Sequence, residues 1–318
     1  MGVFLSTLNQ MGFLMLLIAL GYLLSKIGAI PDNASRTLSK LENNLFIPAL
    51  VLGTFISNFT VDTFKQSGIF LLGGLITVVV SIPLAILCSR ACTKSPYIRK
   101  IYTYGLSFAN FGFMGNAVVQ ALFPDVFLEY LIFVLPLWVF IYIWGIPSLL
   151  IPKVEEEDKH SLKAKLKSFV NPMLISMLVG MIIGLIAPPI PSFLNNAIST
   201  LGSCMSPIAM LLTGITIAKI NLRTTFKNVS VYVVSVIRLV AFPLLAIVVL
   251  MFLPISPGLA TCIVCALAMP LGLNTIVIPS AYGLDTSAAA GMALISHLLS
   301  CVSIPLIFML FQRLVLGG

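Results

Sequence analysis

The sequence predicts an all-α integral membrane protein, with ten transmembrane helices forming two inverted five-helix repeats in which helices four and nine are broken. Three observations predict this class. First, 59% of the 318 residues are hydrophobic and only 9% are charged, whereas soluble domains carry about 25% charged residues. Second, the apolar residues form continuous runs long enough to span a membrane, with the basic residues grouped between them. Third, two of these runs are interrupted in their middle by Asn, Gly and Pro residues.

A transmembrane helix needs about 20 predominantly apolar residues. The chain offers ten such runs, separated by short polar stretches. Their predicted ranges are 3–25, 38–58, 67–90, 101–123, 126–151, 170–188, 193–217, 228–253, 258–282 and 286–312.

The basic residues predict the orientation of these spans, because cytoplasmic loops are enriched in Lys and Arg. With both termini non-cytoplasmic, 15 of the 18 basic residues fall in inward loops and only Lys65 and Arg313 lie outside. The inward residues are Lys26, Arg36, Lys40, Arg90, Lys94, Arg99, Lys100, Lys153, Lys159, Lys163, Lys165, Lys167, Lys219, Arg223 and Lys227. We therefore expect a multi-pass protein of the plasma or inner membrane, with the lipid bilayer as one partner.

The longest polar stretch divides the chain near its midpoint. We expect a first five-helix repeat over 1–152, a cytoplasmic linker over 153–168 and a second five-helix repeat over 169–318. Because five is an odd number, two such repeats must be inverted relative to each other in the membrane.

Matching interruptions in the two halves favour this repeat. Helices two and seven carry Pro48 and Pro207, and helices three and eight carry Pro83 and Pro243. Helix four contains "ANFGFMG" and helix nine contains "MPLGLNT".

The two glycine-rich interruptions are predicted to form the binding site. Asn110 lies about 14 Å into helix four and Pro270 about 18 Å into helix nine, at 1.5 Å per residue, so both lie near the middle of a core about 30 Å thick. Broken backbone at that depth is tolerated only inside protein or beside a water-filled cavity. Paired breaks in corresponding helices are the best sequence indication of a transporter's binding site.

A small anion is the ligand that such breaks favour. A half-helix that begins at a break presents free N–H groups and a positive dipole end, and Asn amides add further donors. The candidate substrate-binding residues are Asn44, Asn110, Gly112, Gly115, Asn116, Pro270, Gly272, Asn274 and Thr275. The alternative is structural: the glycines permit close helix packing and the amides bond between helices. Trp138 and Tyr142, four residues apart, either form an aromatic wall of the same cavity or pack against lipid.

Arg238 and His297 are polar residues inside predicted spans. Arg238 lies ten residues into helix eight, where a charge is costly and needs a partner. It either neutralises the anion or braces helices against backbone carbonyls or Glu42. His297 is either a proton carrier or a hydrogen-bonded core residue.

Other functional classes find little support in the sequence. There is no nucleotide-binding or hydrolase motif, so we expect neither an enzyme nor an ATP-driven pump. The basic residues follow membrane topology, which argues against a nucleic-acid partner. Cys262 and Cys265 lack nearby ligands, and we expect no metal site and no cofactor, while Na⁺ or H⁺ as a coupling ion stays open.

The segments "FANFGFMGNAVVQALF", "AMPLGLNTIVIPSAYGLD" and "SAAAGMALISHLLSCVSIPL" resemble the auxin efflux carrier family over essentially the whole chain. This resemblance implies two inverted five-helix repeats, with helices four and nine crossing at the substrate site. Asn110 and Gly112 match the first crossover, and Pro270 and Asn274 match the second. One departure is Gly115-Asn116-Ala117, where the family usually reads Gly-x-Pro. The bile-acid:sodium symporters share the overall architecture.

We therefore expect a secondary transporter of small organic anions, most simply carboxylates, that works by alternating access. Helices one, two, six and seven would form a scaffold, and a homodimer is left open. The alternatives are a sodium-coupled organic-anion symporter of the bile-acid type, to which Thr275 could contribute a ligand, or a channel or sensor of the same fold.

Overall fold

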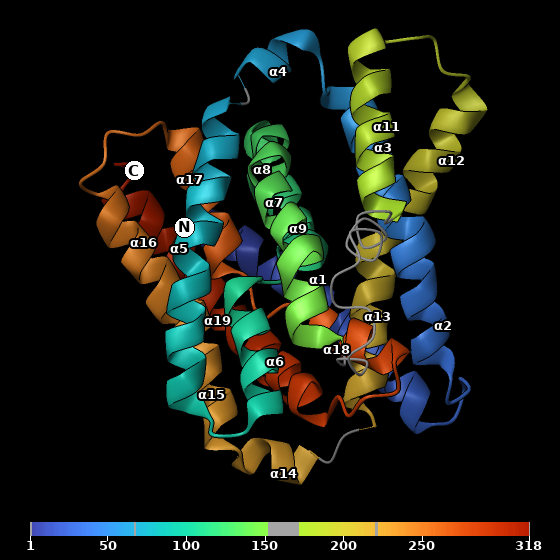
Figure 1. Ribbon diagram of the computed structural model, residues 1–318, viewed down its shortest axis with the longest axis vertical. Helices are drawn as coiled ribbons and strands as arrows, with labels where there is room; N and C mark the ends of the chain where they lie inside the picture. Colours follow the sequence, from blue (N-terminus) through green and yellow to red (C-terminus); the bar gives the residue numbers. More distant parts are fainter. Residues whose placement is uncertain (1, 67, 152–171, 220–221, 318) are drawn as a thin grey trace, which may run out of the picture.

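The computed structural model describes residues 2–66, 68–151, 172–219 and 222–317 (Figure 1). All regular elements in these ranges are helical, apart from one isolated β-bridge between Ala109 and Leu271. The linker predicted over 153–168 lies outside the described residues, so the division of the chain into two repeats stays a prediction.

The first part of the chain folds into helices that are frequently broken or bent. They are α1 (Gly2–Lys26), α2 (Ala34–Leu41), η1 (Glu42–Phe46), α3 (Ile47–Asn58), α4 (Val61–Gln66), α5 (Gly68–Cys92), α6 (Pro96–Ser107), η2 (Phe111–Gly115), α7 (Asn116–Leu122), η3 (Pro124–Val126), α8 (Phe127–Phe133), α9 (Leu135–Phe140) and η4 (Ile141–Leu150).

The second part follows a similar succession. Its helices are α11 (Pro172–Ile186), α12 (Ser192–Ser203), α13 (Met205–Ile217), α14 (Leu222–Lys227), α15 (Val229–Val236), η5 (Ile237–Ala241), α16 (Phe242–Leu250), α17 (Pro257–Ala268), α18 (Asn274–Ala281) and α19 (Ser287–Leu314).

Within the described ranges, five continuous helical stretches are long and apolar enough to cross a membrane. They cover Leu8–Lys26, Gly68–Cys92, Ser192–Ile217, Val229–Leu250 and Ser287–Leu314. Further apolar helices such as α11 and α17 are shorter. The protein is thus a helical membrane protein, and the full count of ten spans remains a prediction.

Two of the bends are single π-helical turns that precede a proline. At η1 the Ile47 amide donates to the Glu42 carbonyl, and at η5 the Phe242 amide donates to the Ile237 carbonyl, five residues back in each case. The next residue is proline in both helices, and it has no N–H to donate. Such π-turns often occur at functional positions, and these two carry Glu42 and Arg238.

The helices gather into two groups (Figure 1). In one group α1 packs on α13, while α3 packs on α11 and α12. In the other, α5 packs on α6, α8 and α9, and α16 packs on α17. The first group holds the helices predicted as a scaffold, and the breaks of the chain lie in the second.

Candidate functional site

The first break separates α6 from η2. Ser95 caps α6 by accepting a hydrogen bond from the Ile98 amide, and a proline occupies its first position. After 12 residues the helix ends at Ser107, and Phe108 is extended, with φ −123° and ψ 97°. Helical structure resumes at η2, where the Asn110 side-chain oxygen accepts from the Met114 amide at 3.3 Å. The break predicted at Asn110 is therefore present.

The second break repeats this construction. Ser256 caps α17 by accepting from the Leu259 amide, and proline again follows the cap. This helix also has 12 residues, and Met269 after it is extended, with φ −70° and ψ 149°. Helical structure resumes at Asn274, so the break predicted at Pro270 is present as well.

The two breaks touch through their backbones. Ala109 and Leu271 form an antiparallel β-bridge, and the Asn110 amide donates to the Pro270 carbonyl at 2.7 Å. A Cβ atom added at Gly272 would overlap the carbonyl oxygen of Phe108. Glycine at 272 is therefore what lets the two extended segments approach this closely.

Arg238 braces both breaks from one side. Its guanidinium donates from Nη1 to the Leu106 carbonyl at 2.9 Å, from Nη2 to the Ala266 carbonyl at 2.7 Å and from Nε to the Met269 carbonyl at 3.3 Å. The Leu106 carbonyl lies in the last turn of α6 and the Ala266 carbonyl in the last turn of α17, and Met269 directly follows α17. A cation is favourable there, because the C-terminal ends of helices carry unpaired carbonyls and a partial negative charge. Of the two predicted roles, this geometry favours bracing by carbonyls.

His297 of α19 pairs with the first break. Its Nδ1 lies 2.8 Å from the Ala293 carbonyl, which can only accept, so Nδ1 carries the proton. Nε2 is then the acceptor for Asn110 Nδ2 at 3.0 Å. His297 therefore holds the side chain that caps η2, and both residues are buried. Of its two predicted roles, this geometry favours the hydrogen-bonded core residue.

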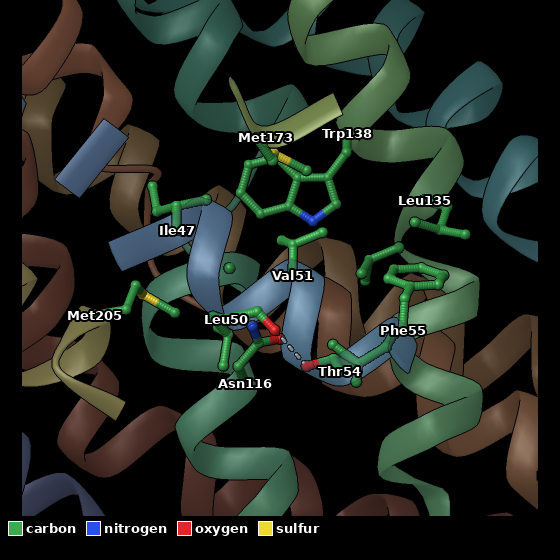
Figure 2. A pocket seen from close by; sticks show the side chains of 13 residues that line it. Ile47, Leu50, Val51, Thr54, Phe55, Asn116, Leu135, Trp138, Met173 and Met205 are labelled. Atoms are coloured by element: carbon green, nitrogen blue, oxygen red, sulfur yellow. Dashed lines mark hydrogen bonds between the residues drawn. The ribbon is translucent and has the colours of Figure 1, made fainter. Parts of the chain in front are cut away.

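A small cavity lies beside the first break, between it and the helices of the scaffold group. Its volume is about 30 Å³, room for only a few water molecules, which need at least about 10–15 Å³ each. Gly112 and Asn116 line it from the break, Trp138 from α9, and Ile47 and Met205 from α3 and α13. Figure 2 shows Trp138 on one side of the cavity and Asn116 on the other. The cavity is closed to a carboxylate ligand in this conformation.

Asn116 is the polar side chain in this cavity with unused bonding capacity. It is 8% exposed, and its Oδ1 has no hydrogen-bond partner among the described residues. At Gly112 the Trp138 ring is so close that an added Cβ would lie 2.5 Å from Cζ2. The absence of a side chain at Gly112 therefore leaves room for the Trp138 ring. An unpaired buried amide oxygen is unfavourable, and a hydrogen-bond donor would relieve it.

Gly115 accommodates a second aromatic residue. The Tyr130 hydroxyl donates to the Phe111 carbonyl at 3.1 Å, and a Cβ at Gly115 would overlap that hydroxyl. Tyr130 of α8 can therefore bond the first residue of η2 only because residue 115 lacks a side chain.

The predicted residues of the second break lie apart from the cavity lining. Asn274 donates to the Tyr104 hydroxyl at 2.9 Å, and Thr275 donates to the Gly272 carbonyl at 2.8 Å. Asn44 is exposed and donates to the Lys40 carbonyl of its own helix at 2.8 Å. The structure thus brings Asn110, Pro270, Gly272, Arg238 and His297 together at the breaks, and Gly112 and Asn116 at the cavity.

Several residues of the site escape prediction from the sequence. Tyr104 and Tyr130 lie in apolar stretches, and nothing in the sequence around them marks them as part of a site. The matched half-helices could have been inferred from one signal, the Ser-Pro pairs at 95–96 and 256–257 where the two helices begin. Trp138 was a candidate and lines the cavity, whereas the side chain of Tyr142 lies outside the described residues.

Comparison with known proteins places most of the chain in one family. The model of a family described as membrane transport protein matches residues 6–308. The comparison with curated proteins finds no match.

Proposed function

Because the chain belongs to the membrane transport protein family, we propose that it is a secondary transporter of small organic anions, most simply carboxylates. The match bears out the resemblance to the auxin efflux carrier family and makes the protein a multi-pass membrane transporter. One observation carries the proposal of anion transport. The two helix breaks are in contact through a hydrogen bond from the backbone N–H of Asn110 to the backbone carbonyl of Pro270.

The chemistry at the breaks favours an anion. The first turn of the helical segment after each break leaves N–H groups without intrahelical partners and presents a positive dipole end. Asn116 adds an amide to the cavity beside the first break, and an amide can turn to present its N–H₂ group to a carboxylate. Among the residues that the structure describes, no Asp or Glu lines this cavity to repel an anion.

Matched features of the two halves support an inverted repeat with crossing helices four and nine. Each broken helix begins with Ser-Pro and breaks after 12 helical residues. Helix α1 packs on α13, and α11 likewise packs on α3. This is expected of a repeat in which helix one corresponds to helix six and helix two corresponds to helix seven. Alternating access would then open the cavity as the group of broken helices moves against the scaffold group.

Uptake into liposomes tests this function. Purified full-length protein should take up labelled malonate, malate or indole-3-acetate with saturable kinetics. Flux that does not saturate would indicate a channel, and binding without flux would indicate a sensor. Uptake that requires a sodium gradient would favour the sodium-coupled alternative, and transport of none of these acids would reject them as substrates.

The proposed orientation has both termini outside, in the plasma or inner membrane. In a variant whose native cysteines are replaced, Gly317→Cys should react with an impermeant thiol reagent on intact cells, because it follows the last span. Lys94→Cys, between α5 and α6, should react only after the cells are opened. The reverse pattern would overturn the orientation.

A further inference from the structure

Glu42 is a buried carboxyl group that the proposed site does not use. It is the first residue of η1, and it is 0% exposed. Neither Oε1 nor Oε2 has a hydrogen-bond partner among the described residues. A carboxylate in that situation is strongly unfavourable unless a cation joins it.

The elements packed on η1 supply no such cation. They are α2, α3, α11, α12 and α13. Within these described helices the only charged side chains are Arg36 and Lys40 of α2, and both are exposed. A hard metal ion would need several oxygen ligands at once, whereas a proton needs only the carboxyl itself.

A row of polar side chains leads to Glu42 from the start of α2. Ser35, Ser39 and Glu42 follow the spacing of one helix face, and their exposed fractions fall from 9% to 3% to 0%. Ser39 donates to the Ser35 carbonyl at 2.7 Å, and the Ser35 hydroxyl has no partner. Asn33, just before the row, is exposed.

The same helix also reaches the cavity. Ile47 lines the cavity and lies five residues after Glu42, about 7.5 Å along the helix axis. The π-turn between them interrupts the regular hydrogen bonding of the α-helix. A change in the charge of Glu42 is therefore placed to act on the wall of the cavity.

We propose that Glu42 binds the proton that couples transport, and that the row of Ser35 and Ser39 is its access route. This rests on the proposed transport function. The carboxylate accepts a proton from water at the start of α2 and becomes a neutral acid. It releases the proton to water on the other side after the conformational change, so one proton accompanies the anion.

Glu42→Gln removes the proton site while keeping the size of the side chain. In liposomes with labelled malonate, the wild-type protein should accumulate malonate under an inside-alkaline pH gradient. Glu42→Gln should keep malonate exchange between equal pH values and lose the gradient-driven accumulation. Asp62→Asn, which alters an exposed carboxyl group in the first turn of α4, is the control and should behave as wild type.

An infrared measurement on the purified protein separates this proposal from the transport function. At neutral pH, the difference between the wild-type and Glu42→Gln spectra should contain the band of a protonated carboxyl group. A difference spectrum without that band, accumulation by Glu42→Gln equal to wild type, or accumulation driven by sodium alone would overturn the proposal. If malonate is not transported, the infrared result still decides whether Glu42 holds a proton.

Discussion

Arg238→Gln should lower the free energy of unfolding by about 3 kcal/mol, because hydrogen bonds from a charged group contribute about 1.5–3 kcal/mol each and glutamine cannot replace all three. The guanidinium donates hydrogen bonds to the Leu106, Ala266 and Met269 carbonyls. Loss of these bonds would leave buried acceptors unpaired. Arg238→Lys should be intermediate, since an ammonium cannot reproduce the planar fork. The melting temperature in detergent measures the effect.

Arg313→Gln is the control for this prediction, because Arg313 lies in the last turn of α19 and is exposed. It should melt as the wild type does. If Arg238→Gln instead keeps its melting temperature and loses carboxylate binding, the arginine serves the substrate and the bracing account is wrong.

Gly272→Ala should also be strongly disruptive, since its new methyl group would overlap the Phe108 carbonyl oxygen. The extended segments would have to separate, which stretches the bond from the Asn110 amide to the Pro270 carbonyl. Overpacking of this kind costs about 1–3 kcal/mol, and we expect uptake to fall with stability. Uptake and melting temperature are measured on the same preparation.

Gly258→Ala is the matched control on α17, because the nearest atoms to its added Cβ lie 3.9 Å away on Phe70. It should leave melting and uptake unchanged. Wild-type stability and uptake in Gly272→Ala would show that the close approach of the breaks is dispensable.

The two breaks could be predicted from the sequence because their cause is local. Asn110 and Pro270 stand in glycine-containing stretches within apolar runs, and these residues disfavour a continuous helix. Gly112 and Trp138 were likewise candidates by type and position.

The partners of Arg238 could not be predicted, because the Leu106 carbonyl is 132 residues away in the chain and only the packing of α6, α17 and η5 brings them together. The burial of Glu42 was also not predicted. The predicted span began at 38, whereas the helical structure begins at Ala34 and continues through a π-turn, so Glu42 lies in the middle of a helical stretch and is covered by the helices around it.

The central proposal, that a carboxylate binds in the cavity beside the first break, is tested most directly by the affinity of Asn116→Ala for malonate. Asn110 is less suitable, because its side chain also caps η2 and pairs with His297. Asn195→Ala, at an exposed amide of α12, is the control and should bind as the wild type does. Loss of one hydrogen bond to a charged ligand should weaken binding roughly 10- to 150-fold in Asn116→Ala. Unchanged affinity in Asn116→Ala would contradict the assignment of the site.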